Sequence, residues 1–217
     1  MKDKIKILYE DNHLLVVVKP VNILSQQDST KDQDMLSLLK MYIKEKYKKE
    51  GNVYLGLVHR LDRPTGGIMV FAKTSKAASR LSKEIIDNKL KKKYYAVVEG
   101  TIKEKEGKLE DYIVKEESNS YITTKEKGKY AALEYKVLKE KDNLSLVDIT
   151  LLTGRHHQIR VQFKNINHPL YGDQRYNKQD KNQLALFAYH LEFIHPTTKE
   201  LMVFEQTPKY GIFKKFF

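Results

Sequence analysis

The chain has 217 residues, of which 41% are hydrophobic and 31% are charged, a balance typical of folded globular proteins that excludes a disordered chain. Lys and Arg outnumber Asp and Glu by 40 to 28, and the resulting net charge of +12 favours a polyanionic partner such as nucleic acid, although a lysine-rich solvated surface gives the same count. There is no cysteine, which excludes thiol nucleophiles, disulfides, thiolate zinc sites and iron–sulfur clusters.

The N-terminal part of the chain predicts a hairpin followed by a helix. Two apolar runs within residues 5–18 are separated by the turn-forming pair Asp11-Asn12, a pattern typical of a β-hairpin. Apolar residues recur at helical spacing over residues 32–47, and we expect Gly51 to end that helix.

A polar segment between two expected strands is the first candidate for chemistry. The strands are residues 54–58 and 68–72, and the segment between them, residues 59–67, holds Pro64, Gly66 and Gly67. These residues interrupt regular structure, so residues 59–67 are expected to form a loop.

The remainder of the chain alternates single helices with strands. Ser75 is expected to cap a helix with an inward stripe of Ala78, Leu81, Ile85 and Ile86. Ile159, Phe163 and Ile166 share one face of a third helix, and the charged residues 101–129 predict a projecting hairpin or loop of uncertain order. Further strands are expected over residues 94–98, 131–138, 144–152, 184–194 and 201–204.

The order of these elements predicts an α+β fold with a largely antiparallel sheet. No Gly, Ser or Pro-rich linker divides the chain, so we expect a single catalytic domain over residues 1–217. The N-terminus is charged and no run of about 18 apolar residues occurs, which predicts a soluble, cytoplasmic protein without a membrane partner.

Asp62 stands out within the predicted loop. In an extended segment Arg60 and Asp62 share one face while Leu61 points into the core. Flanking Arg60 and Arg63 favour the anionic form of Asp62. Such a carboxylate serves as a nucleophile, as a metal ligand or, most often, as half of an ordinary ion pair.

The longer string around Asp62 decides among these readings by resemblance. Residues 57–73 contain His59-Arg60-Leu61-Asp62-Arg63-Pro64-Thr65-Gly66-Gly67, which resembles the His-Arg-Leu-Asp-x-x-Thr-Ser-Gly signature of the RluA family of pseudouridine synthases. The resemblance implies that Asp62 is the catalytic residue. Gly66 departs from the family pattern, because it occupies the usual Ser position.

A second string lies on the expected strand. Residues 92–100 resemble the family's Lys-x-Tyr-x-Ala-x-Val-x-Gly motif, which implies that Tyr94 stacks on the target base and assists proton removal from C5. A tyrosine on a strand is more often a core aromatic, and Tyr95 is the better core candidate, because neighbours on a strand face opposite ways. Lys92 and Lys93 are expected either to bind RNA phosphates or to form a solvated surface.

A third string, residues 153–161, resembles the family's Thr-Gly-Arg-x-His-Gln-Ile-Arg-Val motif. The resemblance implies that Arg160 pairs with the catalytic Asp and that Ile159 lines its pocket. Arginine suits the pairing because its charge is permanent and its two-pronged geometry matches a carboxylate. His156 and His157 are expected to diverge, and no third ligand is evident, so no metal site is predicted. Lys19-Pro20 and two segments, residues 168–173 and 186–191, also resemble family elements.

The resemblance therefore implies isomerisation of uridine to pseudouridine in structured RNA, either ribosomal or transfer RNA. The base is flipped out, the N1–C1′ bond breaks and C5 joins C1′, with no cofactor. Arg60 is expected to fill the vacated base stack. Whether Asp62 attacks C1′ or removes the 2′-proton stays open.

Two rival functions remain. The first is a catalytically silent RNA-binding protein that keeps the same fold. The second is a glycoside or nucleoside hydrolase, which normally uses two carboxylates, and Asp148 or Asp173 are candidates for the second acid.

Overall fold

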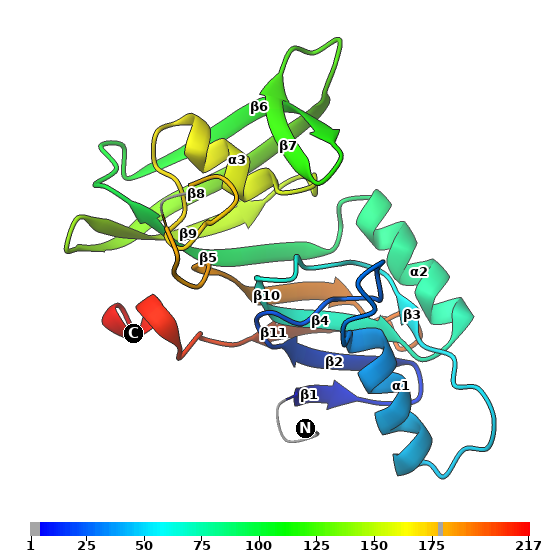
Figure 1. Cartoon of the computed structure of the whole chain (residues 1–217). Coiled ribbons are helices and arrows are strands. Elements are labelled where there is room, and N and C mark those ends of the chain that lie inside the picture. Colours follow the sequence, from blue (N-terminus) through cyan, green and yellow to red (C-terminus); the bar gives the residue numbers. More distant parts are fainter. Residues whose placement is uncertain (1–4, 178–179) are drawn as a thin grey trace. The chain divides into compact units, whose positions relative to one another are not determined.

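The computed structural model describes residues 5–177 and 180–217. Contacts group the chain into two compact units (Figure 1). The first unit is the chain up to Leu90 together with His190–Gln206, and the second is Lys91–Tyr189 with Thr207–Phe217. The single catalytic domain over residues 1–217 stays a prediction.

The strands of the first unit pair in an antiparallel manner. β2 pairs on one side with β1 and on the other with β4, which also pairs with β3, while the C-terminal half of β10 pairs with β11. The bounds of these strands are β1 (Lys6–Glu10), β2 (Leu14–Lys19), β3 (Gly56–Leu57), β4 (Gly66–Ala72), β10 (Leu186–Ile194) and β11 (Leu201–Glu205). The predicted N-terminal hairpin is confirmed, whereas the strand expected over residues 54–58 is shorter.

The core of the first unit follows from the alternation of apolar residues along its strands. Leu14, Val16, Ile68 and Val70 lie on one face and pack in a cluster that includes Leu81 of α2 (Ser75–Ile86). Leu15, Val17, Met69 and Phe71 on the other face are equally buried. Burial on both faces explains why these strands are almost wholly apolar.

Both helices of the first unit begin at a side-chain cap. Asp34 caps α1 (Met35–Lys46) by accepting a hydrogen bond from the Ser37 amide, and Thr74 caps α2 by accepting one from the Ala77 amide. Each cap satisfies an amide that has no acceptor within its helix.

Three expectations about these helices were wrong. α1 ends at Lys46, before Gly51, and α2 is capped by Thr74 and not by Ser75. The inward stripe of α2 includes Ala77 beside Ala78, Leu81 and Ile85, whereas Ile86, at the last position of the helix, is 78% exposed.

The strands of the second unit also pair in an antiparallel manner. β9 (Leu144–Leu151) pairs with β5 (Lys91–Glu99) and with β8 (Lys129–Lys141), and β6 (Glu106–Glu116) pairs with β8 and with β7 (Asn119–Thr123). The charged residues 101–129 therefore form a hairpin that belongs to the sheet. All these pairs are antiparallel, which confirms the predicted fold class.

α3 (Gln158–Asn165) packs against β6 and β7, and a short 3-10 helix, η2 (Gly211–Lys215), lies near the C-terminus. Within residues 5–177 and 180–217, no helix has the length and hydropathy needed to cross a membrane.

Candidate functional site

Asp62 lies in an irregular loop between β3 and β4. The loop is shorter than predicted, because Gly66 and Gly67 belong to β4, where Gly67 pairs with Lys19 at a φ of 134°. That backbone conformation suits glycine and is strained for other residues. Leu61 is buried while Arg60 is exposed and Asp62 is half-buried, as the alternation predicted.

Ser25 and His59 anchor the loop beside Asp62. The Ser25 hydroxyl donates to the Leu61 carbonyl at 2.7 Å and accepts from the Leu61 amide at 3.1 Å. His59 accepts a hydrogen bond at Nε2 from the Val70 amide of β4 at 3.1 Å. The backbone on the N-terminal side of Asp62 is therefore held to the core at two points.

Lys19 holds the other side of the loop. It is fully buried, and its Nζ donates to the carbonyls of Pro20 at 3.0 Å, Ile23 at 2.6 Å and Arg63 at 3.1 Å. Burial lowers the pKa of Lys19 to about 7; the charge of Asp62 opposes that shift and the charge of Arg63 adds to it. Three acceptors match the three N–H donors of an ammonium group.

Sequence reasoning missed this role of Lys19. The Lys-Pro element was recognised only as a family feature. The signal was present, since Lys19 is the single cation at the end of an otherwise apolar strand, β2.

The arginines flanking Asp62 differ in their contacts. Arg63 forms an exposed ion pair with Asp32 at 2.6 Å. Asp32 is a partner that the sequence did not predict for Arg63. Arg60 is exposed and makes no hydrogen bond or ion pair with residues 5–177 or 180–217. Its guanidinium is therefore accessible to a ligand.

Thr65 closes the loop on the C-terminal side. Its amide donates to the Asp62 carbonyl at 3.0 Å, which forms a turn. The Thr65 hydroxyl is buried and has no hydrogen-bond partner among the described residues. A buried hydroxyl without a partner is costly, so the turn around Asp62 carries an unsatisfied donor.

Arg160 is buried on α3 in the second unit. Its Nε donates to Asp173 Oδ2 at 2.8 Å and its Nη2 to Oδ1 at 2.6 Å, which is a two-pronged ion pair. The guanidinium carbon also lies 5.1 Å from the ring centroid of Tyr176. Asp173 therefore orients Arg160, a partner that the sequence reasoning did not assign, and the pairing of Arg160 with Asp62 stays a prediction.

A chain of polar groups continues from Tyr176. Its hydroxyl lies 2.7 Å from His157 Nδ1 and accepts from the Ser120 amide of β7 at 2.9 Å. Burial first, and then the nearby charge of Arg160, lowers the pKa of His157 to about 2, so the imidazole is neutral. This network joins the start of α3 to the β6–β7 hairpin.

The expectation that His156 and His157 diverge was wrong. Their rings stack with centroids 3.7 Å apart, because His157 has a left-handed φ of 54° that turns both side chains to one side. His156 Nδ1 contacts the Ser120 hydroxyl at 2.9 Å. Among the residues that the structure describes, no three His, Asp or Glu side chains cluster in a way that could hold a metal ion.

The two tyrosines of β5 are placed differently from the prediction. Tyr94 is 6% exposed, whereas Tyr95 is half-buried and stacks on Tyr189 at 3.7 Å. Tyr95 is therefore the less buried of the two, because its partners Tyr189 and Phe217 leave part of its ring open. The role of Tyr94 at the target base stays a prediction.

The remaining candidates for RNA contact lie in the second unit. Lys92 is half-buried beside Gly154, and burial lowers the pKa of its ammonium group. Lys93 is half-buried and Ile159 is 5% exposed on α3. A half-buried ammonium costs less to desolvate further when it meets a phosphate, so Lys92 suits that role.

The two acids considered for a hydrolase are both engaged. Asp173 is held by Arg160, and Asp148 accepts a hydrogen bond from the Tyr189 hydroxyl at 2.9 Å. Burial raises the pKa of Tyr189, and the neighbouring Asp148 charge raises it further. Both oxygens of Asp173 are held by Arg160 in a buried ion pair, so Asp173 does not fit the second acid of a hydrolase.

Comparison with known proteins gives one consistent family. The family model described as RNA pseudouridylate synthase matches residues 13–165. An uncharacterized RNA pseudouridine synthase of Aquifex aeolicus is 36% identical over 93% of this chain and 68% of its own length. A ribosomal large subunit pseudouridine synthase D of Borreliella burgdorferi is 34% identical over 87% of this chain and 60% of its own length.

Solved structures share the fold. The structure described as human RNA pseudouridylate synthase domain containing 4 superposes with a TM-score of 0.79 at 22% identity, over 96% of this chain and 89% of that one. At that identity the similarity establishes the fold, and the sequence matches above establish the family.

Proposed function

Because the chain belongs to the RNA pseudouridylate synthase family, we propose that it converts specific uridines of ribosomal RNA to pseudouridine, with Asp62 as the catalytic carboxylate. The observation that supports Asp62 is its setting: a half-buried carboxylate whose flanking backbone is held by Ser25 and by the buried Lys19. This chemistry requires a carboxylate that is held in place and that the substrate can still reach.

The proposed reaction is an isomerisation whose atoms balance without a co-reactant. The N1–C1′ bond breaks, the freed uracil turns, C5 joins C1′, and the proton lost from C5 is matched by one gained at N1. Asp62 starts the reaction by attack at C1′ or by removing the 2′-proton. Tyr94 and Arg160 keep the roles that the motifs imply, which are to hold the base and to pair with the carboxylate.

The proposed substrate is a uridine flipped out of structured RNA. Flipping costs a few kcal/mol, which basic contacts to the RNA backbone offset. Arg60 supports this step, because its exposed guanidinium is able to stack in the vacated position. Ribosomal RNA is favoured over transfer RNA because relatives at 34% and 32% identity carry the name ribosomal large subunit pseudouridine synthase.

The test of Asp62 is the variant Asp62→Asn, assayed by tritium release from RNA labelled at uracil C5. We expect no turnover, with folding and RNA affinity retained, because Asn keeps the shape of Asp but has no charge. Asp32→Asn is the matched control, since it removes an exposed acid that pairs with Arg63, and it should keep wild-type turnover. A normal rate for Asp62→Asn would remove Asp62 from the mechanism.

Two further readouts separate the alternatives. Mapping pseudouridine across total RNA with and without the gene identifies the substrate, and a loss confined to transfer RNA would contradict the ribosomal assignment. Free uracil detected by chromatography would indicate a hydrolase. RNA binding without any new pseudouridine would indicate a silent binding protein.

A further inference from the structure

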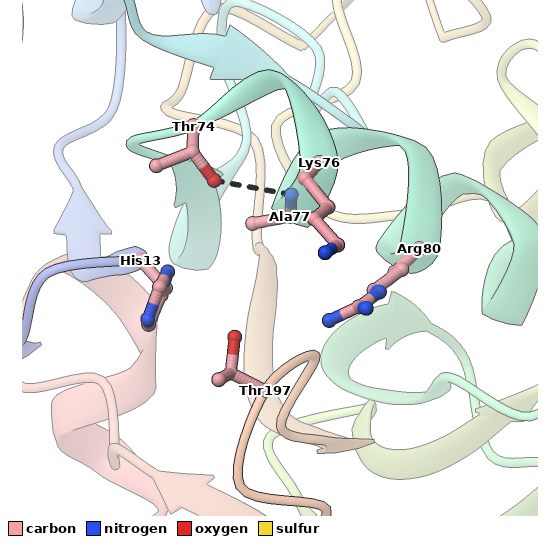
Figure 2. A pocket seen from close by; sticks show the side chains of 6 residues that line it. All are labelled: His13, Thr74, Lys76, Ala77, Arg80 and Thr197. Carbon is pink, nitrogen blue, oxygen red and sulfur yellow. Dashed lines mark hydrogen bonds between the residues drawn. The ribbon is translucent and has the colours of Figure 1, made fainter.

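A hollow of about 250 Å³ opens beside the start of α2 in the first unit, and we call it the α2 hollow (Figure 2). None of its lining residues belongs to the three family motifs. They are His13, Thr74, Lys76, Ala77, Arg80 and Thr197.

The lining brings basic groups together from separate parts of the chain. His13 lies in the turn between β1 and β2, and Thr197 lies in the turn between β10 and β11. Lys76 and Arg80 are four residues apart on α2, so their side chains share one helix face. Figure 2 shows Lys76, Arg80 and Thr197 pointing toward the same space, with His13 at its edge.

The positive charge of the hollow is largely uncompensated. Lys76 is exposed and forms no ion pair with residues 5–177 or 180–217. Arg80 uses one N–H group, on Nη1, to donate to the Pro196 carbonyl at 2.6 Å, and a guanidinium has five N–H donors, so others remain for a ligand.

No acidic side chain lines the hollow. Asp11, which precedes His13 by two residues, already accepts from the amides of His13 and Leu14 and contacts His195 at 2.9 Å. Its oxygens are therefore engaged in these hydrogen bonds, and among the described residues they form no ion pair with Lys76 or Arg80.

We propose that the α2 hollow binds a phosphate group of the substrate RNA backbone. The groups that converge there are an ammonium, a guanidinium and a hydroxyl, all of which donate hydrogen bonds to phosphate oxygens. The floor at Ala77 is small and apolar, which leaves room for a compact anion. The RNA source of the phosphate rests on the proposed function, and free inorganic phosphate has the same chemistry.

The variant Lys76→Gln tests the proposal, because the Lys76 side chain is exposed and forms no hydrogen bond or ion pair with the described residues. RNA affinity is measured by fluorescence anisotropy over a series of KCl concentrations. We expect about tenfold weaker binding at 0.1 M salt and a slope of log affinity against log salt that is smaller by about 1, as for the loss of one phosphate contact.

Lys44→Gln is the matched control, since it removes one exposed lysine of α1 that has no partner among the described residues. If Lys76→Gln lowers the RNA affinity and its salt dependence no more than Lys44→Gln does, the proposed phosphate site is refuted. Inorganic phosphate titrated into the wild-type protein should shift the NMR signals of the His13 ring and the Ser75 amide. Shifts there without an effect of Lys76→Gln on RNA binding would make free phosphate the ligand and overturn the RNA assignment.

Failure of the phosphate site and failure of the proposed function give different experimental results. Wild-type protein that forms no pseudouridine but binds RNA in a Lys76-dependent manner would refute the isomerase and keep the hollow. Normal pseudouridine formation by the wild-type protein, together with unaltered RNA binding by Lys76→Gln, would keep the isomerase and refute the phosphate site.

Discussion

Arg160 and Lys19 are both buried cations, and they are stabilised in different ways. Arg160 meets a carboxylate, Asp173, through two hydrogen bonds, whereas Lys19 meets only backbone carbonyls. The planar fork of arginine fits a carboxylate, and the three divergent donors of an ammonium fit three separate carbonyls. Each residue type is therefore matched to its own acceptors, and an exchange at either position carries a penalty.

Arg160→Lys should reduce turnover more than RNA affinity. Lysine keeps the charge but loses one of the two hydrogen bonds to Asp173, so the free energy of unfolding should also fall by about 1–3 kcal/mol. Initial rates and urea unfolding measure both effects. Arg175→Lys is the control, because Arg175 is exposed and contacts Ser118, and equal effects of the two variants would contradict the role of Arg160.

Lys19→Met should lower both stability and turnover. Methionine has a similar length but no donor, so the carbonyls of Pro20, Ile23 and Arg63 lose the hydrogen bond from Lys19, at a cost of about 3 kcal/mol in total. Turnover should fall because the loop on the C-terminal side of Asp62 loosens. Lys6→Met, at an exposed position on β1, should leave urea unfolding and turnover near wild type, and a similar result for Lys19→Met would show that the loop needs no such anchor.

At the scale of elements, one carboxylate joins α1 to the sheet. Glu10, at the end of β1, accepts hydrogen bonds from Tyr42 and Lys46 of α1, from Tyr47 and from Lys73. Its side chain is only 7% exposed. A buried carboxylate is stable only when its partners supply enough hydrogen bonds, and here four side chains converge on it.

Glu10→Gln should destabilise the protein in a pH-dependent manner. Burial alone raises the pKa of Glu10, but hydrogen bonds from Lys46, Lys73 and the two tyrosines outweigh it and lower the pKa to about 2. The stabilisation is present above the unfolded pKa near 4.5 and is lost as pH falls through about 2; it amounts to about 3 kcal/mol at neutral pH.

The check is chemical denaturation of wild type and Glu10→Gln between pH 7 and pH 2. The difference in unfolding free energy should shrink toward pH 2. Glu50→Gln, at an exposed position with no partner in the described part of the chain, is the control. A difference that stays constant across this range would mean that Glu10 contributes by shape and not by charge.

At the scale of the whole molecule, the net positive charge favours RNA as a partner more than any single contact does. The chain carries a net charge of +12, and proposed contacts are spread over Arg60, Lys92, Lys93 and the α2 hollow. RNA binding by many weak phosphate contacts releases counterions, so affinity depends steeply on salt.

RNA affinity should therefore fall by about a thousandfold between 50 and 200 mM KCl, the loss expected when about six phosphates are contacted. The rate at saturating RNA should change little, because the isomerisation itself moves no net charge between protein and solvent. Titrations at each salt concentration measure the first quantity and single-turnover rates the second. A salt-independent affinity would indicate recognition by base contacts alone.

The sequence by itself determined the α+β class, most strand and helix positions, the family and the place of Asp62 in a loop, because periodicity and motifs are local. It could not place the residues whose partners are distant along the chain. Asp173 is 13 positions from Arg160, and Arg63 is 44 positions from Lys19. It also misjudged Tyr94 against Tyr95, the C-terminal end of α1 and the cap of α2, and it left open whether residues 101–129 form a hairpin or a loop. Burial and hydrogen-bond partners depend on which segments pack together, so only the tertiary structure decided that Lys19 holds the Asp62 loop and that Asp173 orients Arg160.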